Sequence, residues 1–534
     1  MTRRVLIVSN RFPPQVVGGA EVVAHRQAVA LRARGWEVAV LAGGLPGPGL
    51  NPGSLSSETV DGIEVFRFTL RPWRARDAYS AEAERVLGAV LLAHRPDVVH
   101  VHNWEGLGAN LIPAAKRAGA RVVVTLHDHG PYCFKGTLMR NNGAICDDPQ
   151  QCAVCAPRAQ VHPGFAAPIR LRRDYVLWCL DQADAIVAPS RYLAASASRP
   201  GLLRQQVAAL SNGIDLDRVR VSTRESGAEG VRFACFSYLG EHKGIPSLLD
   251  AAERLARDET LSGRWSLAVA GHGPLAAALV ADVARGRFGD AVTYAGHLPR
   301  EEALALLARS DVSVLASIWP ENEPVTLMEA IAAGKAQLAS RLGGNVELIA
   351  DNRSGLTFAP GSGEDLARQM RRLIREPGLA RAFGRFNAER RHAFGEEATI
   401  DRLTALYGAP PSAPGPAAQV VLCVGTRVSD ELALMMHRLH ALEAPGPNLR
   451  FIPSDWACSR AWRDACLVWL MDDGDAEAAE AAAGRASRSG IPVLAPRGSR
   501  FAGQGGGAAP GRTFATALEA AAAITATAAM RAGA

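Results

Sequence analysis

Residues 319–334 read WPENEPVTLMEAIAAG, and this stretch decides the fold of the second half of the chain. Two carboxylates, Glu321 and Glu329, stand in it with seven residues between them. Pro324 suits the first residue of a helix, where a missing N–H costs nothing, and Gly334 suits the position just beyond a helix end. The stretch therefore predicts one carboxylate ahead of a helix and one inside it.

Apolar runs flank this helix on both sides. Residues 312–316 precede it and residues 336–340 follow it, and both runs are typical of buried strands. A helix that opens from the carboxyl end of a parallel strand directs its unpaired N–H groups at a ligand and favours an anion. We therefore expect a phosphate at this helix start, with Glu321 at the rim of the site.

The chain begins with a similar unit of strand, loop, helix and strand. Residues 5–9 predict a strand, a loop with Gly18 and Gly19 follows, and an apolar stripe continues to Gly35 before a strand at 37–42. The glycine pair suits a backbone that approaches a ligand closely. The spacing G-x-G-x-x-G is absent from it, which disfavours a nicotinamide cofactor.

Two further predicted strands, 97–102 and 122–126, end in polar residues that include His102 and His127. Ligands of open α/β sheets bind outside the carboxyl ends of the strands. For His127, which lies between a strand and a polar loop, we favour a role in function. For His102 the sequence does not favour a functional role over a structural one.

The pattern repeats after a polar connector near residues 222–230. Strands are predicted at 231–238, 267–270 and 292–295, and a helix at 246–255 follows the loop that carries Lys243. A lysine in such a loop can meet a phosphate as a point charge, although most single lysines are merely exposed. The repetition predicts two successive Rossmann-like domains with a cleft between them.

Composition and charge restrict the class of protein. The chain of 534 residues needs more than one core, and 48% hydrophobic with 21% charged residues is ordinary globular composition. A net charge of +6 and 6% aromatic residues do not predict a nucleic-acid groove. No run of about 18 strongly apolar residues occurs, and the first apolar run is too short for a signal peptide. We expect a cytoplasmic enzyme that can also make peripheral contact with the inner face of the membrane.

Two basic clusters bear on that membrane contact. Either cluster could bind anionic lipid headgroups, but we favour the interpretation that both are ordinary solvated surface. The first consists of Arg71, Arg74 and Arg76, and the second of Arg170, Arg172 and Arg173.

Nine cysteines without an export signal argue against a disulfide scaffold. Four of them lie close together with the spacing C-x12-C-x5-C-x2-C, namely Cys133, Cys146, Cys152 and Cys155. Four thiolates can hold a tetrahedral structural zinc, with free thiols or a redox pair as the alternatives. A catalytic metal is not expected.

Together these motifs resemble the family 4 retaining glycosyltransferases of the GT-B fold, over residues 5 to about 407. The most specific is E-N-x-P-x-x-x-x-E-A, at Glu321 to Ala330, followed by A-A-G. The others are Gly18-Gly19-Ala20-Glu21, Asp97-Val98-Val99-His100-Val101-His102, Thr125-Leu126-His127-Asp128, Asn212-Gly213-Ile214-Asp215 and Gly343-Gly344-Asn345-Val346-Glu347.

The resemblance implies an α/β fold of two Rossmann-like domains facing a cleft. Residues 1–215 would form the acceptor domain with the cysteine-rich loop 133–155, residues 225–390 the nucleotide-sugar domain, and residues 391–408 the closing helices. Beyond the resemblance, composition predicts a Pro-rich linker at 409–416, and strands alternating with Ala-rich helices predict an additional small α/β domain of unassigned role at 417–534.

The resemblance also implies a hexosyltransferase that moves a sugar, with retention, from a nucleotide donor to a glycan or lipid-linked acceptor in cell-surface polysaccharide synthesis. No cofactor would be required. His127 and Glu321 would hold the donor sugar and Glu329 the ribose. Contacts to the diphosphate would come from Gly19, Lys243 and the helix start at Pro324, Val325 and Thr326.

Two residues depart from the family pattern. Tyr238 stands where an arginine is common before the phosphate lysine, so another base such as Arg341 would have to compensate, or donor binding would be weaker. Lys335 stands where a proline is usual. The alternatives to the transferase are a non-catalytic GT-B scaffold that binds nucleotide sugars, and a GT-B phosphorylase or epimerase.

Overall fold

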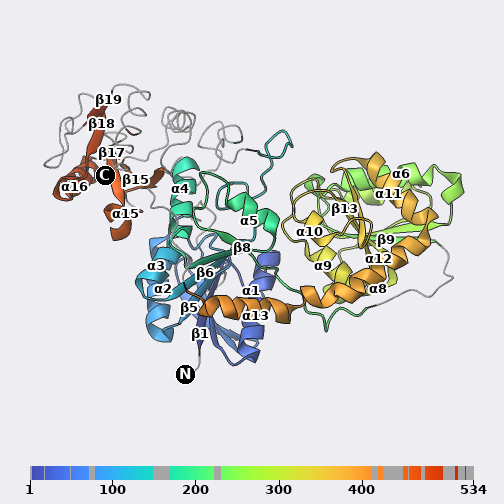
Figure 1. Cartoon of the computed structure of the whole chain (residues 1–534), viewed down its shortest axis with the longest axis horizontal. Helices are drawn as coiled ribbons and strands as arrows, with labels where there is room; N and C mark the ends of the chain where they lie inside the picture. Colours follow the sequence, from blue (N-terminus) through green and yellow to red (C-terminus); the bar gives the residue numbers. More distant parts are fainter. Residues whose placement is uncertain are drawn as a thin grey trace. The chain divides into compact units, whose positions relative to one another are not determined.

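The structure is a computed structural model of the whole chain. It describes residues 3–16, 18–47, 50–70, 78–147, 155, 169–221, 230–410, 419–424, 449–454, 456–470, 476–496, 512–514 and 524. The chain forms two compact units: the first contains residues 1–187, 197–207 and 409–534, and the second contains residues 188–196 and 208–408. Figure 1 shows the elements along the chain.

The first unit contains an eight-stranded sheet in the order β3-β4-β2-β1-β5-β6-β7-β8. Parallel pairs join β4 to β2, β2 to β1, β1 to β5, β5 to β6 and β6 to β7, whereas β3 and β4 form an antiparallel hairpin that the sequence analysis did not predict. The strands are β1 (Arg4–Ser9), β2 (Glu37–Gly44), β3 (Leu55–Val60), β4 (Ile63–Thr69), β5 (Val98–Val101), β6 (Arg121–Thr125), β7 (Ala185–Ala188) and β8 (Val207–Ala209).

The helices of this part follow the strands along the chain. They are α1 (Gly19–Ala33), α2 (Ala81–His94), α3 (Leu111–Arg117), α4 (Ile169–Leu180) and α5 (Arg191–Ala197). Residues of β1 and β6, such as Ile7 and Val123, are fully buried, because a parallel sheet between helices needs apolar side chains on both faces.

The second unit contains a six-stranded sheet in the order β11-β10-β9-β12-β13-β14, in which neighbouring strands pair in parallel. Numbered from its first strand, this order is 3-2-1-4-5-6, that of the doubly wound Rossmann fold. The strands are β9 (Val231–Phe236), β10 (Trp265–Ala270), β11 (Val292–Gly296), β12 (Val312–Leu315), β13 (Ala336–Ser340) and β14 (Gly355–Phe358).

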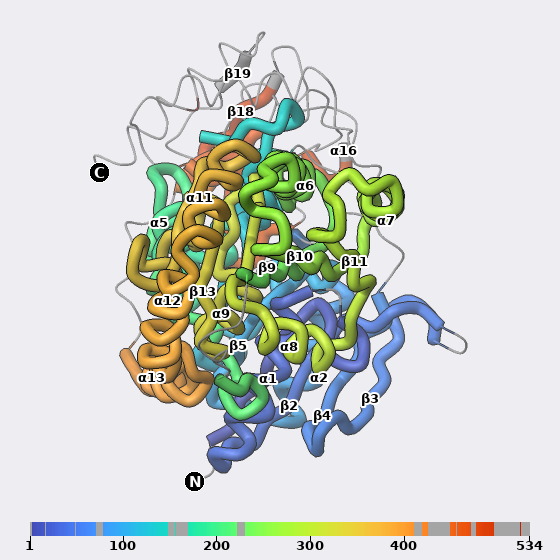
Figure 2. The backbone as a smooth tube through the Cα atoms, turned by 90° about the vertical axis from the view of Figure 1, so that its right-hand side faces the viewer, coloured from blue at the N-terminus to red at the C-terminus, as the bar shows by residue number. Residues whose placement is uncertain are grey.

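The helices of the second unit are α6 (Ile245–Ala256), α7 (Ala276–Ala284), α8 (Arg300–Arg309), α9 (Val325–Ala332), α10 (Asn345–Leu348), α11 (Gly363–Arg375), α12 (Pro377–Arg390) and α13 (Glu396–Gly408). In Figure 2, α6 and α11 run beside each other. Two hydrophobic clusters cover the sheet. Val314 of β12 belongs to the cluster of α6 and α11, whereas Leu315 belongs to that of α9, because successive strand side chains point to opposite faces.

A third sheet is formed by residues near the carboxyl end of the chain and clusters with the first unit. Its order is β16-β15-β17-β18-β19, which is 2-1-3-4-5 in chain order, as in flavodoxin-like folds. The elements are β15 (Gln419–Val424), β16 (Leu449–Pro453), α15 (Ser459–Arg463), β17 (Ala465–Leu470), α16 (Ala476–Arg488), β18 (Val493–Pro496) and β19 (Arg512–Phe514).

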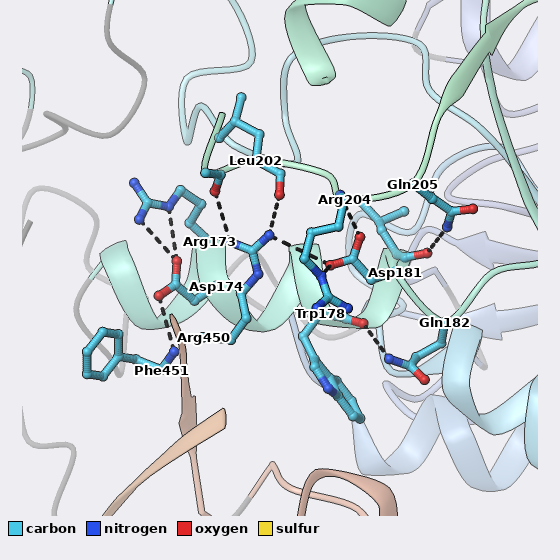
Figure 3. A network of polar contacts seen from close by, with 12 residues as sticks. Arg173, Asp174, Trp178, Asp181, Gln182, Leu202, Arg204, Gln205, Arg450 and Phe451 are labelled. Carbon is cyan, nitrogen blue, oxygen red and sulfur yellow. Dashed lines mark hydrogen bonds and ion pairs between the residues drawn. The ribbon is translucent and has the colours of Figure 1, made fainter. Parts of the chain in front are cut away.

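Helix α4 and edge strand β16 meet through a buried ionic network, drawn in Figure 3. Asp174 accepts hydrogen bonds from Arg170 Nε at 3.2 Å, from Arg173 NH2 at 3.0 Å and from the backbone N–H of Phe451 at 3.2 Å. Arg450 of β16 donates to the carbonyl of Gly201 at 2.9 Å. Buried charged side chains thus connect the third sheet to helix α4 of the first unit.

This network corrects the interpretation of one basic cluster. Arg170, Arg172 and Arg173 are buried, and Arg170 and Arg173 pair with Asp174, so they form neither a solvated surface nor a lipid site. The other cluster, Arg71, Arg74 and Arg76, lies outside the described residues. Among the described residues, no helix combines the length and hydropathy needed to cross a membrane.

Candidate functional site

The second sheet reverses its strand order between β9 and β12, which are paired neighbours. Loops that leave the carboxyl ends of two such strands diverge to opposite sides and create the ligand site of an open α/β sheet. Lys243 lies in the loop after β9 and Glu321 in the loop after β12. The structure therefore brings two residues of the predicted site to the point where the fold itself predicts a ligand.

Glu321 is the centre of a hydrogen-bonded cluster. Its Oε1 accepts from Lys243 Nζ at 2.6 Å, from Ser317 Oγ at 2.6 Å and from Trp319 Nε1 at 2.7 Å. Lys243 Nζ also lies 4.3 Å from the centre of the Trp319 ring, within range of a cation–π contact. Glu321 is only 8% exposed, so these contacts fix the orientation of its carboxylate.

Two glycines allow the loops of this cluster to approach each other. A Cβ on Gly244 would lie 1.9 Å from the carbonyl oxygen of Ala316, and Gly244 also has a positive φ of 67°. A Cβ on Gly344 would lie 1.7 Å from the carbonyl oxygen of Asn322. Gly344 N donates to the carbonyl of Glu321 at 2.6 Å. The backbone of the Gly343-Gly344 motif thus packs against the loop that carries Glu321 and hydrogen-bonds to it.

Helix α9 begins one residue later than the sequence predicts. Pro324 is the residue before the helix, with an extended ψ of 119°, and not its first residue, because its carbonyl accepts the opening bonds from Leu327 and Met328. Helical bonding therefore starts beyond Val325 and Thr326, whose N–H groups belong to the first turn, where helix geometry supplies no acceptor. The predicted helix start is therefore shifted by one residue, and the anion site at this start stays a prediction.

Glu329 lies inside α9, as predicted, and its carboxylate has a partner that sequence reasoning missed. Arg300 NH2, from the first residue of α8, lies 3.1 Å from Glu329 Oε1. Both side chains are partly exposed. The Arg300 guanidinium and the Glu329 carboxylate thus form an ion pair between α8 and α9.

A row of aromatic and imidazole rings lies at the same sheet edge. The ring of Tyr238 lies 5.7 Å from that of His242 and 5.6 Å from that of His272, and the His272 ring lies 4.6 Å from that of His297. Burial, followed by the charge of Lys243, lowers the pKa of His242. Tyr238 is therefore surrounded by imidazoles at the position where an arginine is common.

Arg341 and Lys335 both make hydrogen bonds to neighbouring elements of the second unit. Arg341 Nε donates to Thr357 Oγ1 of β14 at 3.2 Å. Lys335 is buried and donates from Nζ to the carbonyl of Ala308 at the end of α8, at 2.7 Å. Burial lowers the pKa of Lys335 to about 8.

The remaining site residues lie in the first unit, at the carboxyl ends of its strands. Gly19, exposed, is the first residue of α1, and a Cβ on it would meet nothing within 4 Å, so the local packing does not require glycine there. His127 follows β6, and its Nε2 lies 3.0 Å from Nδ1 of His102, which follows β5. Burial lowers the pKa of His127 to about 4.

The cysteine-rich loop is described only in part. Cys133, Cys146 and Cys155 are partly buried, and Cys152 lies outside the described residues. Within the described part of the chain, no group of three or more His, Cys, Asp or Glu side chains is placed to hold a metal ion. The zinc interpretation requires all four thiols and stays a prediction.

The two Rossmann-like halves define the class of GT-B glycosyltransferases, and the chain belongs to it. Residues 17–218 match the model of Glycosyltransferase Family 4, and residues 227–398 match that of Glycosyl transferases group 1. The predicted fold class and the predicted hexosyltransferase activity are confirmed.

Its relatives include several named transferases. The glycogen synthase of Mycobacterium tuberculosis is 25% identical over 410 residues, which cover 72% of this chain and 90% of the relative. The amylovoran biosynthesis glycosyltransferase AmsK of Erwinia amylovora is 30% identical over 166 residues, which cover 30% of this chain and 40% of the relative.

Solved structures show the same fold. Sucrose-phosphate synthase from Thermosynechococcus elongatus has a TM-score of 0.58 and 18% identity, over 76% of this chain and 98% of the other. Anabaena Alr3699/HepE in complex with UDP has a TM-score of 0.55 and 18% identity, over 76% of this chain and 98% of the other.

Sequence reasoning missed the residues that orient the two acids, chiefly Ser317, Trp319 and Arg300. Ser317 and Trp319 carried a usable signal, because polar side chains just after a predicted strand lie at the ligand edge of the sheet. Arg300 carried none, since nothing in the sequence indicates that the first residue of α8 faces Glu329.

Proposed function

We propose that this chain transfers a hexose, with retention at the anomeric carbon, from a nucleotide diphosphate sugar to a glycan or lipid-linked acceptor in cell-surface polysaccharide synthesis, at the cytoplasmic face of the membrane. The observation that carries the proposal is the cluster of Lys243, Glu321 and the α9 start at the switch point of the second sheet. UDP in the related HepE structure supports a uridine nucleotide as the first donor to test.

The chemistry follows from the charges. Cleavage of the sugar–phosphate bond leaves a diphosphate that gains negative charge, and fixed positive groups stabilise that charge most when they need no reorganisation. Lys243 and the N–H groups of Val325 and Thr326 would supply them. Glu321, held by three donors, would orient sugar hydroxyls, and Glu329, held by Arg300, would receive those of the ribose. Gly19 would admit the diphosphate to the first unit, and His127 would contact the sugar.

No cofactor is required in this scheme, because cationic side chains and helix N–H groups take the place of a metal at the diphosphate. The four cysteines of the 133–155 loop would hold a structural zinc that takes no part in the reaction. Metal analysis of protein purified without chelators should give about one zinc per chain. Four alkylatable thiols and no metal would contradict the zinc part alone.

The test is transfer from a panel of UDP-, GDP- and ADP-sugars to lipid-linked and oligosaccharide acceptors, with product configuration read by NMR. Lys243→Met should lower kcat/KM for the accepted donor about 10²- to 10³-fold, since it removes one charge from the leaving group. Arg254→Met, an exposed arginine of α6 paired with Asp250, is the matched control and should retain activity. Neither transfer nor hydrolysis with any donor would contradict the proposal.

A second candidate is a scaffold that binds nucleotide sugars without turnover, and Tyr238 at the arginine position is the observation in its favour. Calorimetric donor binding with no product would support it. A phosphorylase or epimerase would instead convert the donor with phosphate or without an acceptor, which the same product assay detects.

A further inference from the structure

His102 and His127 form a pair that the register of two strands creates. Strands β5 and β6 are parallel neighbours with Val101 opposite Val124, so the residues that follow them leave the sheet side by side. His102 N donates to the carbonyl of Val8 at 2.9 Å, which fixes the backbone of His102. Its ring stacks on that of His127 with centroids 5.3 Å apart and an interplanar angle of 22°.

A third imidazole, that of His100, packs against the ring of His102 and restricts its movement. The ring of His100 lies 4.2 Å from that of His102, and His100 Nε2 lies 2.7 Å from Thr125 Oγ1. His100 is fully buried and His102 is 2% exposed. Burial lowers the pKa of His100 to about 3 and that of His127 to about 4, so both rings are neutral at pH 7.

A neutral imidazole has one N–H donor and one acceptor nitrogen. The 3.0 Å contact between His102 Nδ1 and His127 Nε2 therefore allows two arrangements. In one, His127 donates from Nε2, and His102 must bury an N–H at its own Nε2. In the other, His102 donates from Nδ1, and His127 must carry its proton on Nδ1.

The environment of His102 Nε2 distinguishes the two arrangements. This nitrogen is buried and has no hydrogen-bond partner among the described residues. A buried N–H without an acceptor is rarer in proteins than a buried acceptor without a donor. The arrangement with the proton on His102 Nδ1 is favoured, because it leaves only an acceptor unsatisfied.

We propose that His102 is a positioning residue that holds His127 in the tautomer with its proton on Nδ1, so that His127 acts as a hydrogen-bond donor to an oxygen of the bound substrate. The part of this inference that concerns substrate rests on the proposed function. The oxygen would belong to a sugar hydroxyl or a phosphate, the two acceptor groups that a nucleotide-sugar donor presents. His127 itself is partly buried at the strand end.

The tautomer can be measured without activity. In protein labelled with ¹⁵N-histidine, long-range ¹H–¹⁵N spectra distinguish a protonated Nδ1 from a protonated Nε2, and loss of one signal set in His127→Gln assigns the residue. The wild type should show His127 protonated on Nδ1. In His102→Leu, which lacks the donor, this proton should shift toward Nε2. In His102→Asn, whose side-chain amide nitrogen can replace the Nδ1 donor, it should remain on Nδ1.

Kinetics test whether the tautomer matters. His102→Leu should lower kcat/KM for the donor by about 10- to 100-fold, the range for loss of an orienting partner, and His102→Asn should recover most of it. His94→Asn, a histidine of α2 that pairs with Glu64, is the control and should retain wild-type activity. Thermal melts of each variant separate loss of fold from loss of activity.

The outcomes are distinguishable from failure of the proposed function. Protonation of His127 on Nε2 in the wild type would overturn the inference whether or not the protein transfers sugar. The predicted tautomer, with wild-type kinetics in His102→Leu, would overturn the positioning role. The predicted tautomer with no transfer from any donor would contradict the proposed function and remove the substrate part of the inference.

Discussion

Substitution of Gly244 by alanine tests whether the close approach of two loops creates the donor site. Gly244 lies between Lys243 and α6, and a Cβ there would meet the carbonyl oxygen of Ala316 at 1.9 Å, whereas real Cβ contacts essentially never fall below 3.0 Å. The two loops must therefore separate by about 1 Å. A separation of that size would lengthen the 2.6 Å bond from Lys243 to Glu321 beyond hydrogen-bond range.

The magnitude has two parts. A non-glycine residue at a φ of 67° costs about 1–2 kcal/mol, and forced overpacking adds about 1–3 kcal/mol. Gly286→Ala is a matched control in the same unit, because Gly286 has a φ of 70° and a Cβ on it would meet nothing within 4 Å. Only the first cost applies to the control.

The assay is thermal unfolding with and without UDP. For a unit of about 200 residues, each kcal/mol lowers Tm by about 2–4 °C, so Gly286→Ala should lose a few degrees and Gly244→Ala about twice as much or more. Gly244→Ala should also lose most of the stabilisation by UDP, which Gly286→Ala should retain. Equal melting temperatures and equal UDP shifts in the two variants would refute the reasoning.

Three further predictions concern other charges. Arg300→Met removes the partner of the α9 carboxylate and should raise the donor KM about tenfold with little change in kcat; an unchanged KM would contradict it. Asp174→Asn leaves buried arginines uncompensated and should destabilise the first unit by about 3–5 kcal/mol in calorimetric melts, whereas Asp61→Asn, at an exposed carboxylate, should not. His100 and His127 have pKa values of about 3 and about 4, below the unfolded value of 6.5, so their contribution to stability is complete above pH 6.5 and is lost as pH falls. Urea titrations should show a loss of about 1.4 kcal/mol per histidine for each pH unit between 6.5 and 4, and constant stability over that range would contradict it.

Local signals were sufficient for much of the fold. Alternating apolar strands and helices predicted β9, β12 and β13, and Pro324 and Gly334 predicted α9 to within one residue. These signals depend on backbone geometry within a few residues, which the sequence determines. Strands β14 and β16 were missed, because the pairing of short strands depends on neighbours that are distant in sequence. The β3–β4 hairpin was missed although its Asp61-Gly62 turn is a local signal.

The basic cluster at Arg170 shows why charge alone misleads. Three arginines in four residues are typical of a solvated face, yet all three are buried. Part of their compensation is local, from Asp174. Strand β16 contributes the ring of Phe451, which lies 4.9 Å from the guanidinium of Arg170, and the N–H of Phe451, which bonds Asp174. No local pattern could relate α4 to a strand so far along the chain.

The sequence by itself determined the family, the two Rossmann-like halves and the residue types of the site, because each motif is a short run whose chemistry and local geometry are its own. Only the tertiary structure decided that Lys243 bonds Glu321, that Arg300 holds Glu329 and that His102 contacts His127. Each of these contacts joins residues of different elements. Strand order and register determine which ends meet, and they are set by the packing of the whole sheet.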